Sequence, residues 1–153
     1  MTGQLEQQAD ALGSHGALLG LDLGDKTIGV AVCDPARMVA TPVETIRRRK
    51  FTIDATRLQE LAAERNAVGY ILGLPLNMDG SEGPRVQSTR AFARNLSNIQ
   101  TLPVAFWDER MSTMAMEREL ISLDTSRAKR AEKIDEMAAT FILQGAIDRL
   151  RSL

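Results

Sequence analysis

Apolar residues set in at position 17, and from there their pattern predicts strands before it predicts helices. Three apolar stretches follow one another at residues 17–23, 27–33 and 38–45. Gly24-Asp25-Lys26 and Asp34-Pro35 are turn sequences, and Pro42 indicates an irregular or edge position in the third stretch. Turns this short join antiparallel neighbours, because parallel strands need a longer crossover. The first half of the chain therefore predicts an antiparallel meander.

In the second half, helical spacing alternates with short apolar runs. Helices are expected at residues 53–65 and 85–96, from Met111 or Ser112 to Leu123, and over the alanine-rich residues 134–150, with strands at 68–72 and 102–108. Such an order predicts an α/β fold, a five-stranded mixed sheet with helices on both faces. Right-handed crossovers place the fourth and fifth strands beside the first. The C-terminal ends of these three strands then lie together, where ligands bind in open α/β sheets.

Acidic residues stand at those strand ends and on the last helix. Asp22 interrupts the first apolar strand, although it could instead cap its own turn. Asp108 and Glu109 close the fifth strand, and only one of them can face a given site because adjacent strand residues point oppositely. Asp135 shares the apolar stripe of the last helix. We expect three of these carboxylates to converge.

Converging carboxylates favour a divalent cation. They repel one another, so without a cation at least one would have a raised pKa, and Mg²⁺ or Mn²⁺ removes that conflict. Two such ions can activate a water and stabilise the leaving oxygen in phosphodiester hydrolysis. Phosphates would be neutralised by Lys26, Arg110 and the basic run before Asp135, which includes Lys129 and Arg130. The sequence therefore predicts a metal-dependent nuclease, whereas the other basic run, residues 47–50, is more typical of a solvated face.

Composition agrees with a single ordinary domain. Of the 153 residues 44% are apolar and 25% are charged, and no apolar run approaches the roughly 18 residues of a membrane span. We expect a flexible leader over residues 1–16, one domain over 17–153, and no membrane partner. The single cysteine, Cys33, fits a cytoplasmic protein, and the single histidine, His15, lies in the leader, which excludes a Cys/His zinc site. A net charge of −1 argues against a large nonspecific nucleic-acid binder.

Several motifs together resemble the YqgF/RuvX family. They are Gly20-Leu21-Asp22-Leu23-Gly24, Ile28-Gly29-Val30-Ala31, residues 40–45, residues 73–80, Asp108-Glu109-Arg110 with Ser112-Thr113, and Asp135 with Ala138-Ala139 and residues 142–144. The resemblance covers residues 17–150. It implies an RNase H-like fold and a metal site on Asp22, Glu109 and Asp135, which favours Glu109 over Asp108. Thr27 departs from the family, which usually has a basic residue there.

The resemblance also implies a biological role. The family is described as nucleases that mature the 5′ end of small-subunit ribosomal RNA, and alternatively as Holliday junction resolvases acting on branched DNA. We therefore expect a nucleic-acid partner, pre-rRNA or branched DNA, for a monomer or weak homodimer. Two other classes stay open: an actin-like ATP-binding module, suggested by Asp22-Leu23-Gly24 before a hairpin, and a nucleic-acid scaffold whose active site has decayed.

Overall fold

A six-stranded mixed sheet forms the centre of the protein. The computed structural model describes residues 2–110 and 127–153, with the side chains of the last helix described from Met137 onward. The strands are β1 (Thr2–Gln4), β2 (Ala17–Leu23), β3 (Thr27–Cys33), β4 (Ala40–Arg47), β5 (Ala67–Leu74) and β6 (Val104–Asp108), in the spatial order β1-β6-β5-β2-β3-β4. The meander β2–β3–β4 is antiparallel, and β5, β6 and β1 pair in parallel. Crossovers place β5 beside β2, as predicted, whereas β6 lies beside β5 and so one strand further from β2 than expected.

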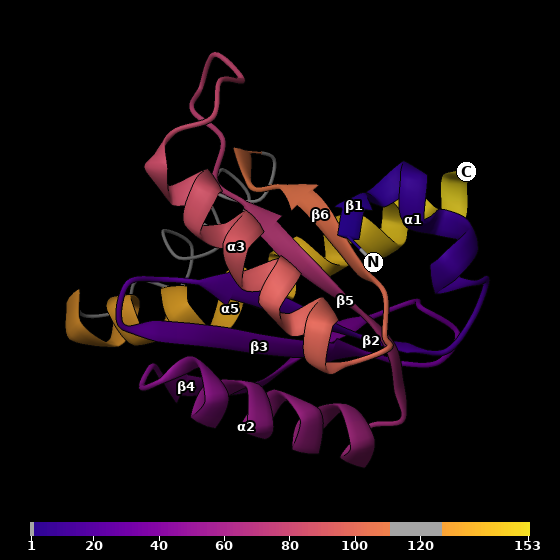
Figure 1. The fold of residues 1–153 in the computed structure, drawn as a ribbon, viewed down its shortest axis with the longest axis horizontal. Coiled ribbons are helices and arrows are strands. Elements are labelled where there is room, and N and C mark those ends of the chain that lie inside the picture. Colours follow the sequence, from indigo (N-terminus) through magenta and orange to yellow (C-terminus); the bar gives the residue numbers. More distant parts are fainter. Residues whose placement is uncertain (1, 111–126) are drawn as a thin grey trace.

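Helices cover both faces of this sheet. The described helices are α1 (Leu5–Leu12), α2 (Phe51–Glu64), α3 (Pro84–Ile99) and α5 (Arg127–Ser152). In Figure 1, α2 and α3 lie in front of the sheet and α5 runs behind it. The helix predicted from Met111 or Ser112 to Leu123 lies outside the described residues. Among the helices that are described, none has both the length and the apolar character needed to cross a bilayer.

Side-chain alternation along β2 assigns each residue to one of two cores. Leu19 and Leu21 belong to the core beneath α2 and α3, whereas Leu18 belongs to the core beneath α5. Gly20 also faces α5, because a Cβ added there would lie 2.7 Å from the Cβ of Leu143. Successive strand residues point to opposite faces, so Asp22 faces α5 as well. The first predicted acid is thus placed on the α5 side of the sheet.

The leader differs from the flexible segment expected for residues 1–16. β1 pairs in parallel with β6 and supplies the sixth strand, which corrects the prediction of five. α1 follows directly and buries Leu5 and Leu12 in the core beneath α5. The guanidinium of Arg37, only 2% exposed, then donates to the carbonyl oxygens of residues 12, 13, 15 and 16 over 2.6–3.1 Å. The leader therefore packs on the domain.

Two contacts give the direction of α5 across the sheet. Gln144 accepts a hydrogen bond from the Ala40 N–H (2.8 Å) and donates one to the Met38 carbonyl oxygen (3.1 Å). Ala40 lies at the edge where β2 begins, because Ala40 pairs with Cys33 and the β2–β3 register continues from Leu19 and Val32. The Ala139 carbonyl oxygen, more than one turn earlier in α5, lies over Gly20, which is further along β2, so the earlier turns of α5 run toward the edge where β2 ends.

Candidate active site

Asp22 and Glu109 come together across strand β5. Asp22 is near the end of β2, and Glu109 directly follows β6. β5 lies between those strands, and its Gly73 leaves room for Glu109 to reach over it. A Cβ at Gly73 would lie 2.7 Å from the Glu109 Cγ and 2.5 Å from the Ile142 Cδ1. The two carboxyl groups are hydrogen-bonded to each other on the α5 face of the sheet.

This contact changes the acidity of Glu109. Its pKa is raised from 4.5 to about 8, first by burial and then by the hydrogen bond and the negative charge of Asp22. The Arg85 guanidinium opposes the rise, and Asp108 adds a smaller increase. At neutral pH Glu109 therefore keeps its proton, because its half-buried carboxyl group cannot ionise readily beside Asp22 without a compensating cation. Positive charge placed beside the two carboxyl groups would favour the ionised form of Glu109.

Asp108, the alternative to Glu109, has a different partner. Its carboxylate forms an ion pair with the Arg110 guanidinium at 2.6 Å and also accepts the Arg110 backbone N–H at 3.0 Å. These bonds hold the pKa of Asp108 below its ordinary value, the hydrogen bond from the Arg110 side chain being the largest cause. Strand alternation directs Asp108 to the face opposite Glu109. Of the two acids, the structure brings Glu109 to Asp22.

The predicted phosphate-binding side chains lie in different settings. Arg110, besides its ion pair, donates to the Met78 carbonyl oxygen at 3.1 Å and so ties the loop between β5 and α3 to the end of β6. That loop projects from one end of the molecule in Figure 1, and Met78 is 84% exposed. Lys26 is exposed in the β2–β3 turn. Arg110 therefore has a structural contact that the sequence did not indicate.

The third predicted acid falls where side chains are not described. The backbones of Asp135, Lys129 and Arg130 lie in α5, but their side chains are outside the described part of the structure. Among the side chains that are described, no group of three His, Cys, Asp or Glu residues is close enough to hold a metal. Asp22 and Glu109 are thus two members of the predicted set, and the position of the Asp135 carboxylate stays a prediction.

A polar cavity of about 380 Å³ opens at the same end of the sheet, and sequence reasoning missed it. We call it the arginine cavity, and its lining consists of Leu23, Gly24, Asp25, Arg48, Arg49, Arg85, Ser88 and Thr89. The available signal was the basic run at residues 47–50, which the sequence presents as a solvated face. Only the fold shows that two of its arginines meet the first turn of α3.

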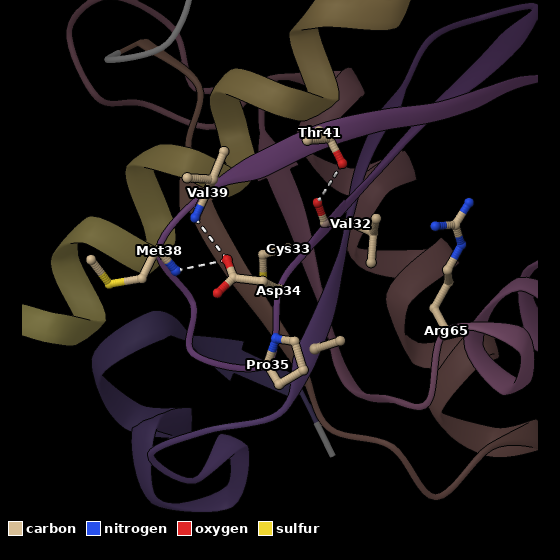
Figure 2. Close-up of a pocket in the computed structure, with 9 residues that line it drawn as sticks. Val32, Cys33, Asp34, Pro35, Met38, Val39, Thr41 and Arg65 are labelled. Atoms are coloured by element: carbon tan, nitrogen blue, oxygen red, sulfur yellow. Dashed lines mark hydrogen bonds between the residues drawn. The ribbon is translucent and has the colours of Figure 1, made fainter.

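A larger cavity of about 530 Å³ lies at the opposite edge of the sheet (Figure 2). Its wall is mainly apolar and includes Val32, Pro35 and Val39, with Arg65 from the end of α2 on the side away from Val39. The Asp34 carboxylate already has partners there, since it accepts hydrogen bonds from the backbone N–H groups of Met38 and Val39 at 2.9 and 2.8 Å. Ala17, which lines this cavity, is five strand residues from Asp22, about 17 Å. This cavity is therefore separate from the acid pair.

Comparison with known proteins agrees with the motifs. The family model RuvX, described as Holliday junction resolvase, matches residues 16–149. A protein of Rhodopseudomonas palustris strain TIE-1, named "Putative pre-16S rRNA nuclease", is 72% identical over 139 residues, covering 91% of this chain and 87% of its own length. One from Bradyrhizobium diazoefficiens with the same name is 70% identical, covering 91% and 86%.

Solved structures show the same fold at low sequence identity. Thermus thermophilus RuvC in complex with a Holliday junction substrate is 14% identical, with a TM-score of 0.53, over 89% of this chain and 96% of that one. The yeast mitochondrial Holliday junction resolvase Ydc2 is 11% identical, with a TM-score of 0.50, over 97% and 86%. The predicted RNase H-like fold is confirmed. The family match over residues 16–149 and the 72% identity to a curated relative show that this chain belongs to the RuvX family.

Proposed function

We propose that this chain is a divalent-metal-dependent nuclease that processes the 5′ end of pre-16S rRNA. The observation that carries the proposal is the Asp22–Glu109 carboxyl pair, held at the C-terminal ends of β2 and β6 in a chain of the RuvX family. The substrate is taken from the name of relatives that are up to 72% identical. Hydrolysis of a phosphodiester bond requires negative charge to be neutralised at the scissile phosphate.

Mg²⁺ or Mn²⁺ fits the chemistry of the pair. Both donors are carboxylate oxygens, the ligands that hard divalent ions prefer. The proton held by Glu109 marks a place where positive charge is needed, since burial and the neighbouring Asp22 raise the pKa of Glu109 to about 8. When bound, such an ion activates water and stabilises the leaving oxygen. Asp22 and Glu109 would hold it, and β5 keeps Glu109 in place through its contact with Gly73.

The backbone of α5 supports Asp135 as the third acid. The Ala139 carbonyl oxygen and Leu143 lie over Gly20, and α5 runs from there toward the end of β2. Asp135 precedes Ala139 by four residues, about 6 Å along a helix. Asp22 follows Gly20 by two residues, about 7 Å along a strand. Equal steps along the two elements carry Asp135 to the level of Asp22, where its carboxylate would join the pair.

Cleavage of a precursor RNA tests the proposal. Purified protein is incubated with a 16S rRNA precursor carrying its 5′ extension, in Mg²⁺, Mn²⁺ or EDTA, and the new 5′ ends are mapped. We expect cleavage in either metal, none in EDTA, and loss of activity in Asp22→Asn, Glu109→Gln and Asp135→Asn. Asp108→Asn is the matched control, because Asp108 pairs with Arg110 on the other face. Cleavage that persists in EDTA, or in Asp22→Asn, would contradict the metal mechanism.

Branched DNA is the second substrate to test, because the family model is described as Holliday junction resolvase. A four-way DNA junction under the same conditions distinguishes the two: symmetric cuts in the junction with no processing of the precursor would favour resolution. Tight ATP binding without cleavage of either substrate would favour the actin-like alternative. The same acid pair is required for both nuclease activities, so the variants above apply to both.

A further inference from the structure

We propose that the arginine cavity binds a backbone phosphate of the nucleic-acid strand that is cut at the acid pair. Its lining includes three arginines, Arg48, Arg49 and Arg85, and a single acidic residue, Asp25. The chain as a whole carries a net charge of −1, so this local excess of positive charge is not a property of the general surface. A concentration of positive charge inside a cavity favours an anion.

Contacts with the protein hold two of these arginines in place. Arg48 donates to the Gly24 carbonyl oxygen at 2.7 Å, and its guanidinium lies 5.7 Å from the centroid of the Phe92 ring. Arg85 donates to the Leu23 carbonyl oxygen at 3.5 Å. Each guanidinium has five N–H donors, so one protein contact leaves several for a ligand. The Arg49 side chain makes no hydrogen bond or ion pair within the described residues, and only its backbone N–H is used, by Asp54.

The set of donors suits a phosphate. A planar guanidinium binds phosphate oxygens through paired hydrogen bonds, and several guanidiniums around one cavity can share a tetrahedral anion. Ser88 adds a hydroxyl donor from the exposed side of α3. The contacts needed are to phosphate alone, so RNA and DNA strands share this chemistry.

The position of the cavity connects it to the acid pair. Leu23 and Gly24, whose carbonyl oxygens anchor the arginines, directly follow Asp22 in the chain. Arg85 faces the cavity and also acts electrostatically on Glu109. A strand with one phosphate at the acids can therefore pass over the end of β2 and place a neighbouring phosphate among the arginines. The inference rests on the proposed function for the identity of the ligand.

Binding, measured without cleavage, tests the inference. Asp22→Asn protein, and independently wild type in EDTA, are titrated into a short labelled single-stranded RNA, and into DNA of the same sequence, at several salt concentrations. We expect Arg49→Gln and Arg85→Gln to weaken binding of both strands roughly tenfold and to reduce the salt slope by about 0.7 for each phosphate that the variant no longer binds. Arg47→Gln is the matched control: it removes the same charge from an exposed neighbour that does not line the cavity.

The outcomes separate this inference from the nuclease proposal. Equal losses of affinity in Arg47→Gln and Arg49→Gln would mean a general charge effect and would overturn the site. Unchanged binding in Arg49→Gln and Arg85→Gln, or no binding by the parent protein, would overturn it too. If the arginine variants lose affinity as expected but wild type cleaves nothing in Mg²⁺ or Mn²⁺, the site stands and the nuclease proposal fails.

Discussion

Glu109→Gln should remove a pH dependence of stability that the acid pair creates. The pKa of Glu109 is raised on folding from 4.5 to about 8, first by burial and then by Asp22. Between these two values the folded state retains a proton that the unfolded state has released. Folding therefore becomes less favourable as the pH rises through this window, and the free energy of unfolding is lowest above pH 8. Glutamine keeps the shape of the neutral acid and cannot ionise.

The magnitude follows from the size of the shift. Moving the pKa of Glu109 from 4.5 to about 8 corresponds to about 5 kcal/mol of unfolding free energy between pH 4 and pH 9. Water entering the site lowers this figure, so we expect a loss of about 3–5 kcal/mol. A domain of this size has about 5–15 kcal/mol in total, so the effect is large enough to measure.

Urea unfolding in EDTA at pH 5 and pH 9 measures this difference directly. Wild type should lose several kcal/mol more than Glu109→Gln between the two pH values, and Asp108→Asn should behave as wild type in this comparison. Mg²⁺ at pH 9 should restore stability to wild type, because a ligand that binds only the folded state stabilises it, and should restore less to Glu109→Gln. The same pH dependence in wild type and Glu109→Gln would refute the assignment of Glu109 to a buried pair.

Three other substitutions test parts of the framework. Arg37→Met removes four hydrogen bonds to carbonyl oxygens of the leader and should lower the free energy of unfolding by at least about 3 kcal/mol. Residues 2–16 should then be cleaved faster by a protease, and unchanged proteolysis would contradict the role of Arg37. Gly73→Ala should lower the free energy of unfolding by about 1–3 kcal/mol and displace Glu109, so that the protein still folds but cleaves its substrate more slowly. Gly83→Ala is the control, because a Cβ at Gly83 would lie 3.6 Å from its nearest neighbouring atom. Arg110→Gln should lower the free energy of unfolding by at most about 1 kcal/mol, yet it should speed amide hydrogen exchange in the β5–α3 loop. Unaltered exchange would show that the Met78 contact does not hold the loop.

The sequence predicted the strands well because their patterns are local. β2 and β3 have the bounds expected from their apolar runs, and β4 is an edge strand, as Pro42 indicated. Short turns enforce the antiparallel meander, and the crossovers leave few alternatives for the remaining strands. Residue spacing within one element was enough for these conclusions. The bounds of α2 and α3 agree within three residues for the same reason, since each buries a regular apolar stripe. α5 begins at Arg127, seven residues before the start expected for it.

Features that depend on distant contacts could not be read in this way. The leader is mostly polar, and its place in the fold comes from two leucines and from the buried Arg37 some twenty residues later. The arginine cavity needs three segments that meet only in the fold. The choice between Asp108 and Glu109 was open because Phe106 and Trp107 are both apolar. The structure packs Phe106 under α2 and α3 and Trp107 under α5, so that Glu109, and not Asp108, comes to the face of Asp22.

The candidate site depends on glycines that let α5 pack closely on the sheet, as well as on its acidic residues. Three glycines lie between α5 and the sheet, and at each an added Cβ would stand within 2.5–2.8 Å of a neighbour: Gly20 against Leu143, Gly73 against Ile142, and Gly145 against Trp107. These glycines allow α5 to approach β2 and β5 more closely than larger residues would. Asp22 and Glu109 lie on that same face, and Asp135 is carried by that helix. Close packing of α5 is therefore a condition of the proposed site, in which acids from three separate parts of the chain would share one cation.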